Sequence, residues 1–422
     1  MNKYFLFLLL TFSLPFSYAQ DKSWLENEVH QINSIDEEDY EDLSFLKEEL
    51  KGKRIVQLGE SSHGIGDYYH LKSRLVKYLH QELGYEVLAM EGGFGDINLA
   101  NVDRDALDAK TLMQKTLFGN FQNEGMLAAY QYLKQVSNSD RPLELAGFDC
   151  QSSSSYFPTF MGKLLKEYDP QLAERFGEEF KSSFSLYHET KDSAKIMKSI
   201  RQNAGLYTAI RTFLQEHKSE IKKSYPDHPQ LIPILLQSLD SFEAYWDFSF
   251  HDLSIFKNSN IRDELMAKNL IWLAEHVYPH KKIILWAHNG HVQKGEASWT
   301  NPDGVKPRLQ GELLDKYFGN ENYVIGIFSI RGETYQHWTQ SYISFDHRDK
   351  DHLAEYKFKD LAGQIHYLPL SQISKTKANK WLFKPITVYQ VETGGEFQVD
   401  PWVELYDAVI VLDKVKRPKY FH

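Results

Sequence analysis

The sequence predicts an α/β protein with a central, mostly parallel sheet, flanking helices and a large helical insertion over the carboxyl ends of the strands. Three observations favour this class: short apolar runs typical of buried strands, helical patterns between them, and a stretch from 156 to 278 in which strand signals fade. The five predicted strands are Arg54–Leu58, Glu86–Met90, Leu143–Phe148, Lys282–Ala287 and Tyr323–Ser329.

Residues 1–19 have the pattern of a secretory signal peptide. Lys3 precedes an apolar run, and Ser17-Tyr18-Ala19 is typical of a cleavage site. The run is shorter than the roughly 20 apolar residues that span a bilayer. We therefore expect an exported protein, periplasmic or secreted, with no stable membrane insertion after signal cleavage.

The elements of the first half of the fold follow in order. Leu43–Leu50 has a helical pattern, and Asp67–Leu83 carries apolar residues at helical spacing before Gly84, a plausible C-cap. Residues 97–137 are expected to be mostly helical. Residues 20–155 thus form the first part of the catalytic core.

The insertion divides this core from its second part. We interpret residues 156–278 as a helical insertion that acts as a lid over the crevice, and residues 279–422 as the return to the sheet. Aromatic residues make up 14% of the chain, and those in 156–260 are candidates for lining an apolar substrate pocket. Near the end, Trp381–Val391 and Trp402–Leu412 are further strand candidates.

Composition limits the classes of function. The chain of 422 residues has a net charge of −10 and no basic block, which argues against a nucleic-acid partner. Cys150 is the only cysteine, so neither an intramolecular disulfide nor a cysteine-based zinc site can form. The oligomeric state stays open.

Titratable side chains follow four of the predicted strands. Because the carboxyl ends of parallel strands line the ligand crevice of an open α/β sheet, we expect these side chains to meet. They are Glu60 and His63, Glu91, Asp149, and His288 and His291. This convergence is the best indication of an active site in the sequence.

The Glu60–His63 loop has the residue types of an acid–base pair. A histidine can take a proton from water near neutral pH, and a carboxylate can fix its tautomer. Gly59 and Gly64 allow the backbone to bend closely around the site. An isolated E-x-x-H is more often a surface loop, so the position between a strand and a helix carries the interpretation.

Glu91, His288 and His291 leave alternatives open. Glu91 is either a turn carboxylate or a neighbour of the Glu60–His63 loop that shares its protons. The two histidines are a metal half-site, a pair of transition-state donors, or one functional and one structural residue. We favour a site without metal, because the sequence contains no H-E-x-x-H motif and no cysteine cluster.

Other common motifs are absent from the sequence. It has no G-x-S-x-G elbow, which disfavours a serine nucleophile, and neither a P-loop nor the Rossmann spacing, so no cofactor is expected. Arg262, taken alone, is explained by a surface ion cluster at the start of an amphipathic helix.

A set of short motifs is distributed in order along nearly all of the chain after residue 19. The set consists of Leu58-Gly59-Glu60-Ser61-Ser62-His63-Gly64, Glu91, Ala146-Gly147-Phe148-Asp149, Arg262-Asp263 with Met266-Ala267 and Asn269, Trp286-Ala287-His288-Asn289-Gly290-His291-Val292, and Tyr406-Asp407-Ala408. In this ordered set the chain resembles the erythromycin esterase family, bacterial hydrolases that open a macrolactone ring.

The resemblance implies roles for individual residues. It makes His63 the general base that activates water and gives it the partners Glu60, Glu91, Arg262, His288 and His291, in a site that needs no metal. Asp149, Lys72 and Arg74 are the expected supporting residues. Lys72 departs from the family, which usually has arginine at that position, and lysine cannot make a bidentate carboxylate contact.

Three readings follow. The first is an exported esterase that opens a macrolide lactone or a related small-molecule ester by direct water attack, with macrolide resistance as its consequence. The second is a metal-dependent hydrolase or peptidase that uses the same Glu and His residues as ligands. The third is a non-catalytic exported protein that binds an apolar ligand in the same crevice.

Overall fold

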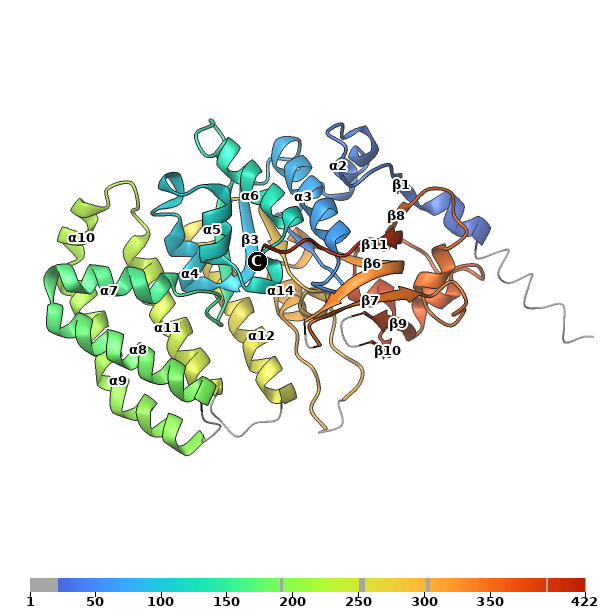
Figure 1. Ribbon diagram of the computed structural model, residues 1–422. Coiled ribbons are helices and arrows are strands. Elements are labelled where there is room, and N and C mark those ends of the chain that lie inside the picture. Colours follow the sequence, from blue (N-terminus) through green and yellow to red (C-terminus); the bar gives the residue numbers. More distant parts are fainter. Residues whose placement is uncertain are drawn as a thin grey trace, which may run out of the picture.

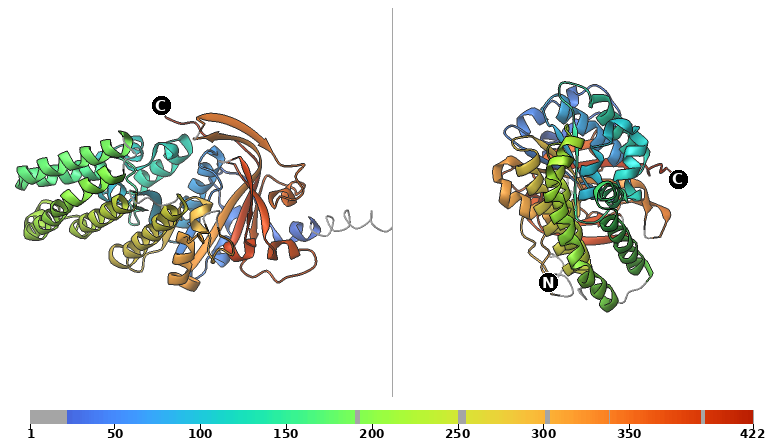
Figure 2. Two further views of the ribbon diagram at one scale, coloured as in Figure 1. Left: turned by 90° about the horizontal axis from the view of Figure 1, so that it is seen from below. Right: turned by 90° about the vertical axis from the view of Figure 1, so that its left-hand side faces the viewer.

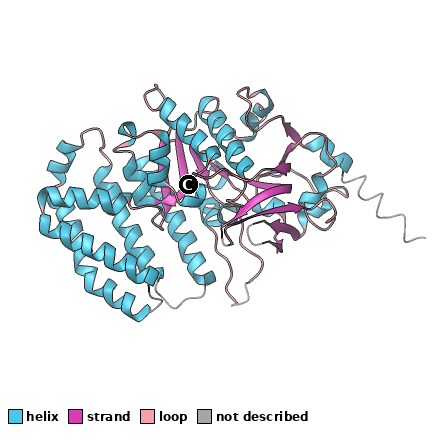
Figure 3. Cartoon of the chain, in the orientation of Figure 1, coloured by secondary structure: helices cyan, strands magenta, loops and turns pink. Residues whose placement is uncertain are grey.

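The computed structural model describes residues 22–189, 193–249, 255–300, 304–337, 339–391 and 394–421. The proposed signal peptide, residues 1–19, lies outside the described residues. The architecture is the expected α/β class, with one large sheet and helices on both of its faces (Figure 1; Figure 3). None of the helices in these described ranges is both long and apolar enough to cross a bilayer.

Six parallel strands form most of the main sheet and reach one of its edges at β4. They lie in the order β11, β6, β2, β5, β3, β4, while β8 and β1 extend one edge in antiparallel fashion and β7 pairs with β6. Their bounds are β1 His30–Ile32, β2 Ile55–Leu58, β3 Val87–Gly93, β4 Glu144–Asp149, β5 Ile283–Trp286, β6 Asn322–Gln336, β7 Ser341–Asp346, β8 Ile365–Pro369 and β11 Ala408–Val415. All five strands predicted along the chain are therefore confirmed, and their carboxyl ends meet at one edge.

Helices from the first half of the chain cover one face of the sheet. Apolar side chains from α3, α5 and α6 pack there against Leu58, Leu88 and Trp286. The bounds are α2 Leu46–Glu49, α3 Gly66–Gln81, α4 Phe94–Ala100, α5 Ala109–Thr116 and α6 Glu124–Val136, with 3₁₀ turns at Glu41–Leu43, Arg104–Ala106 and Gly119–Phe121. The single helix expected at Leu43–Leu50 is thus two short turns.

The insertion is helical throughout its described part. Its helices are α7 Tyr156–Tyr168, α8 Pro170–Glu189, α9 Ser193–Glu216, α10 Lys218–Ser224, α11 Leu231–Ser249 and α12 Ile255–Trp272, which ends in a π-helical turn at Leu273–Val277. Helices α7 to α11 project beyond the β4 side of the sheet and share a separate apolar core (Figure 2). Helix α12 returns to the strand ends, where Asn269 donates hydrogen bonds to the Phe148 carbonyl oxygen and to the Ser241 hydroxyl of α11.

The last third of the chain completes the second face. The elements are α13 Asn289–Val292, α14 Gln310–Phe318, β9 Ile386–Gln390, β10 Gly395–Val399 and α15 Trp402–Leu405, with 3₁₀ turns at Gly319–Glu321, Glu355–Phe358 and Lys380–Phe383. Strands β9 and β10 form a two-stranded sheet of their own. The strand expected at Trp402–Leu412 begins only at Ala408, because Trp402–Leu405 is helical.

Candidate active site

The carboxylate of Glu60 lies directly after β2 and is completely buried. Its Oε1 is 2.8 Å from Nδ1 of His63, and its Oε2 accepts hydrogen bonds from Lys72 Nζ at 2.7 Å and Trp286 Nε1 at 3.1 Å. Lys72 comes from α3 and Trp286 from the neighbouring strand β5. The Glu60–His63 loop therefore holds a hydrogen-bonded carboxylate–imidazole pair inside the protein.

Opposing effects set the charges of this pair. Burial disfavours the charged carboxylate, but Lys72 and the hydrogen bond from His63 outweigh burial and lower the pKa of Glu60. Burial likewise lowers the pKa of Lys72 to about 8, although Glu60 opposes that shift. At neutral pH both groups are charged, so His63 Nδ1 is the protonated ring nitrogen that donates to Glu60.

Two glycines allow other segments to approach this loop. A Cβ on Gly59 would stand 2.1 Å from the side-chain oxygen of Asn289, and one on Gly64 would stand 2.0 Å from the Tyr335 carbonyl oxygen. The amide of Asn289 exchanges hydrogen bonds with the backbone of Ile327 in β6, so it cannot easily move away. Glycine at these two positions keeps β2, β6 and the residues after β5 in contact.

Glu91 is aimed into the site by an irregularity in β3. The register of β3 with β4 shifts between Met90 and Gly93, and irregularities of this kind re-aim side chains. Glu91 Oε1 lies 3.0 Å from Arg262 Nη2 and 3.3 Å from His291 Nε2, and its Oε2 accepts the backbone N–H of His288 at 2.9 Å. Burial opposes its charge, but His291 and Arg262 hold the pKa of Glu91 well below its usual range.

His291 stands between two carboxylates. Its Nδ1 is 2.8 Å from Asp263 Oδ1, and its Nε2 faces Glu91. Burial favours the neutral ring, yet the two carboxylates prevail and raise the pKa of His291 to about 10. His291 is therefore an imidazolium at neutral pH, and its Nε2–H faces Glu91. Arg262 Nη1 lies 3.2 Å from the same nitrogen but cannot donate to it, because both groups are then donors.

Arg262 links three strand ends to α12. Its Nε and Nη2 contact the two carboxylate oxygens of Asp149 at 3.2 and 2.5 Å, a bidentate pair, while Nη2 also reaches Glu91. Asp149 is completely buried. The surface ion cluster considered for Arg262 is therefore wrong, and so is its place at a helix start, because α12 begins at Ile255.

His288 has the opposite tautomer from His63. The backbone N–H of Gly290 donates to Nδ1 of His288 at 2.9 Å, so a neutral His288 carries its proton on Nε2. The rings of His63 and His288 lie 5.2 Å apart between their centroids. One ring thus has Nε2 as the nitrogen that accepts a proton, and the other has Nε2 as a donor.

The structure brings together all the candidate residues except one. His63, Glu60, Glu91, His288, His291, Arg262, Lys72 and Asp149 form one connected cluster. Arg74 does not join it. Its guanidinium pairs with Asp42 at 2.6 Å and donates to the carbonyl oxygens of Glu37 and Asp39, because residues two apart on a helix face different sides.

Two partners in the cluster were missed from the sequence. Asp263 belongs to the Arg262-Asp263 motif, and Trp286 precedes the histidine motif, but nothing in the sequence showed that they bind His291 and Glu60. Arg262 and Asp263 are adjacent in α12, and their side chains reach different parts of the cluster. Their positions in the quoted motifs were the available signal.

The carboxylate oxygens of the cluster are already occupied by N–H donors. Glu60 accepts from Lys72, His63 and Trp286, and Glu91 accepts from cations and a backbone amide. A metal ion would have to displace these donors. Within the ranges that the structure describes, no three His, Cys, Asp or Glu side chains are arranged to hold a metal ion.

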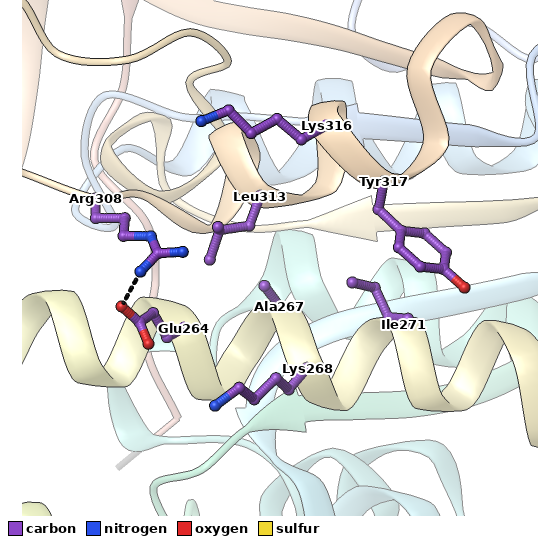
Figure 4. A pocket seen from close by; sticks show the side chains of 8 residues that line it. All are labelled: Glu264, Ala267, Lys268, Ile271, Arg308, Leu313, Lys316 and Tyr317. Atoms are coloured by element: carbon purple, nitrogen blue, oxygen red, sulfur yellow. Dashed lines mark hydrogen bonds and ion pairs between the residues drawn. The ribbon is translucent and has the colours of Figure 1, made fainter.

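A cleft of about 730 Å³ begins at this cluster, with His288, His291 and Asp263 in its lining. Phe328 and Tyr406 also line it. Further lining residues come from 293–300 and 307–309, from β9 and β10, and from Ser259 and Asn260 of α12. Among the described residues of 156–260, no aromatic side chain lines the cleft. A smaller groove of about 290 Å³ lies between α12 and α14, beside Glu264, Arg308 and Tyr317 (Figure 4), and includes none of the cluster residues.

Fold and site together define an α/β protein with a buried cluster of Glu, Asp, His, Lys and Arg side chains at the carboxyl ends of parallel strands. The chain belongs to the erythromycin esterase family, since the family model described as erythromycin esterase matches residues 80–415. It is therefore a hydrolase of that family.

Individual relatives agree with this assignment. The protein YbfO of Bacillus subtilis (strain 168), named as a hydrolase, is 32% identical over 73% of this chain and 72% of its own. Erythromycin esterase type II of Escherichia coli is 21% identical over 71% of this chain and 74% of its own.

Solved structures share the fold. A Bacillus cereus protein has a TM-score of 0.76 at 19% identity and covers 96% of this chain and 99% of its own. An erythromycin esterase mutant in its open conformation has a TM-score of 0.60 at 16% identity, with 93% and 98% covered.

Proposed function

We propose that the protein is an exported esterase that opens a macrolide lactone by direct attack of water, without a covalent intermediate, and so confers macrolide resistance. The observation that carries this proposal is the pairing of His63 and His288, two neighbouring imidazoles with opposite tautomers. One ring is set to take a proton, and the other is set to donate a hydrogen bond. A general base accelerates attack of water on an ester, and a hydrogen-bond donor stabilises the oxyanion that forms.

The base of the reaction is His63. Glu60 fixes the Nδ1–H of His63, so Nε2 accepts the proton as water attacks the ester carbonyl carbon. The C–O bond to the alcohol then breaks, and the same Nε2–H returns the proton to the leaving oxygen. The products are a carboxylic acid and an alcohol, which remain joined when the substrate is a lactone.

The negative charge of the tetrahedral intermediate requires donors. The Nε2–H of His288 is one, and the cationic side chains of Arg262 and His291 add positive potential at the same strand ends. Donors of this kind typically contribute about 3–4 kcal/mol to a transition state. Asp149, Asp263 and Glu91 hold the two cations in place.

The proposal is tested by mass spectrometry of erythromycin incubated with the protein that begins at Gln20. Gain of one water is expected, with the rate lowered by about 10²–10⁴-fold in His63→Ala. His70→Ala is the matched control, because His70 is a partly exposed histidine of α3 that pairs with Asp36. Treatment with a chelator should leave the rate unchanged.

Other outcomes assign the site differently. A chelator-sensitive activity would favour a metal-dependent hydrolase. Erythromycin left intact by a folded protein would overturn the macrolide substrate, and activity unchanged in His63→Ala would overturn the mechanism. Export is tested separately: the N-terminus of protein recovered from outside the cytoplasm should be Gln20, and an uncleaved intracellular chain would contradict it.

A further inference from the structure

Two large exposed hydrophobic side chains lie at the cleft. Within the described residues, four such side chains are exposed: Trp299 at 45%, Tyr317 at 53%, Tyr342 at 46% and Phe397 at 44%. Trp299 and Phe397 both line the cleft that contains His288 and His291. Exposed aromatic side chains beside a catalytic cluster are typical of a binding surface, because each gains free energy when a ligand covers it.

The other two exposed aromatic residues lie elsewhere. Arg417 stands over the ring of Tyr342 with its guanidinium carbon 4.1 Å from the ring centroid. Tyr317 borders the groove between α12 and α14 (Figure 4). They therefore serve as controls for exposure alone.

The two segments that carry Trp299 and Phe397 are tied together. The backbone N–H of Ser298 donates to Asp400 at 2.9 Å, and its hydroxyl donates to the other oxygen of the same carboxylate. Asp400 is buried. Ser298 directly precedes Trp299, and Asp400 follows β10, so these hydrogen bonds hold the loop beside the small sheet. A wall fixed before binding loses less entropy when a ligand arrives.

The charges around the cleft disfavour an anion. The cluster contains the carboxylates of Glu60, Glu91, Asp149 and Asp263 and three cationic side chains, Lys72, Arg262 and His291. The described residues that line the cleft include Asp263 and Asp400 but no lysine or arginine. An anionic substrate would enter against this excess of negative charge.

We infer that Trp299 and Phe397 determine substrate specificity by binding the bulky apolar part of an uncharged or cationic ester. This inference rests on the proposed esterase activity. The apolar part packs against the two aromatic side chains while the ester carbonyl faces the histidines. A small ester does not reach this wall and gains nothing from it.

The test compares two p-nitrophenyl esters, the acetate and the bulky cyclohexanecarboxylate. Trp299→Ala and Phe397→Ala should each raise KM for the bulky ester about tenfold. Their kcat should stay within about twofold, and both constants for the acetate should be unchanged. Trp299→Phe should restore most of the lost affinity, and the control variants Tyr317→Ala and Tyr342→Ala should behave as wild type.

Charge is tested with a second pair of esters of similar length. The wild type should hydrolyse p-nitrophenyl valerate with a kcat/KM at least about tenfold above that of the anionic p-nitrophenyl hemisuccinate. Equal KM values of wild type and Trp299→Ala for the bulky ester, or a preference for the anion, would overturn the inference.

Binding of the uncharged dye Nile red separates this inference from the proposed function. If the wild type hydrolyses no ester but binds the dye, and both alanine variants bind it about tenfold more weakly, the esterase proposal fails while the apolar site stands. If esters are hydrolysed but dye and bulky ester bind equally well to all variants, the esterase proposal stands and the specificity inference fails.

Discussion

The buried carboxylates of Glu60 and Glu91 have similar burial but are stabilised in different ways. Two partners of Glu60, His63 and Lys72, lie within twelve residues of it in the chain. Arg262, a partner of Glu91, lies 171 residues away in α12. The first carboxylate is balanced by a lysine, whose charge can be lost, and the second by an arginine, whose charge cannot. We call Glu60 with His63 and Lys72 the local cluster, and it can change its charge with pH. We call Glu91 with its partners Arg262 and His291, and with Asp149 and Asp263, the long-range cluster, and it fixes the fold around the site.

Arg262→Met should produce the largest loss of stability. Without the guanidinium, the buried carboxylate of Asp149 loses its bidentate cationic partner and that of Glu91 loses one of its cationic partners, which costs about 3–5 kcal/mol of unfolding free energy. Urea denaturation measures this loss. The matched control is Arg308→Met. It removes the partner of Glu264, which lies in α12 as Arg262 does, from an exposed ion pair, and should leave the urea midpoint nearly unchanged.

If both substitutions had the same small effect on the urea midpoint, the long-range cluster would not hold α12 to the strand ends. The comparison between the two carboxylates would then lose its basis. If Arg262→Met unfolds the protein completely, Arg262→Lys keeps one charge and should show an intermediate loss.

The pH dependence of activity should identify the cluster that titrates. The pKa of Lys72, lowered by burial to about 8, means that the ammonium loses its proton as the pH rises through that value. Glu60 then loses its cationic partner, and the hydrogen bond by which Glu60 orients His63 is altered. We expect kcat/KM to fall above pH 8.

Arginine at this position keeps its charge throughout the range, so Lys72→Arg should remove the alkaline decline. Measurement of kcat/KM between pH 6 and 10 for both proteins tests this. A decline that persists unchanged in Lys72→Arg would assign it to another group.

How much of the site was predictable from the sequence depends on chain distance. The apolar strand runs predicted the parallel sheet. The polar residues after these runs predicted a group of neighbouring side chains, namely Glu60, His63, Glu91, His288 and His291. Such patterns suffice because each strand is a local apolar run and parallel strands share one edge. The role of each side chain did not follow from the same patterns.

Two features depend on tertiary structure. The register irregularity in β3 aims Glu91, and no local residue pattern marks it. The Ser298–Asp400 contact that holds the cleft wall joins segments about one hundred residues apart. Packing sets both features, and residue spacing does not encode them. Arg74 is different: it was expected in the site together with Lys72, but helical spacing already places residues two apart on different sides, and Arg74 pairs with Asp42.

Asp263→Asn should have the smallest effect on stability, and it tests what one carboxylate contributes to the long-range cluster. The asparagine oxygen can still accept the backbone N–H of Gln310, so the local fold should persist. One of the two carboxylates that raise the pKa of His291 to about 10 is lost, so this pKa should fall. NMR titration of the histidine ring measures the change.

The sign of the accompanying stability change follows from the direction of the shift. A histidine pKa raised above its ordinary value of 6.5 stabilises the fold fully below pH 6.5, and the contribution is lost as the pH rises through about 10. Asp263→Asn should move the upper limit of this window downward. An unchanged pKa would mean that Glu91 alone keeps His291 charged, and the long-range cluster would then rest on Glu91 and Arg262 without any contribution from Asp263.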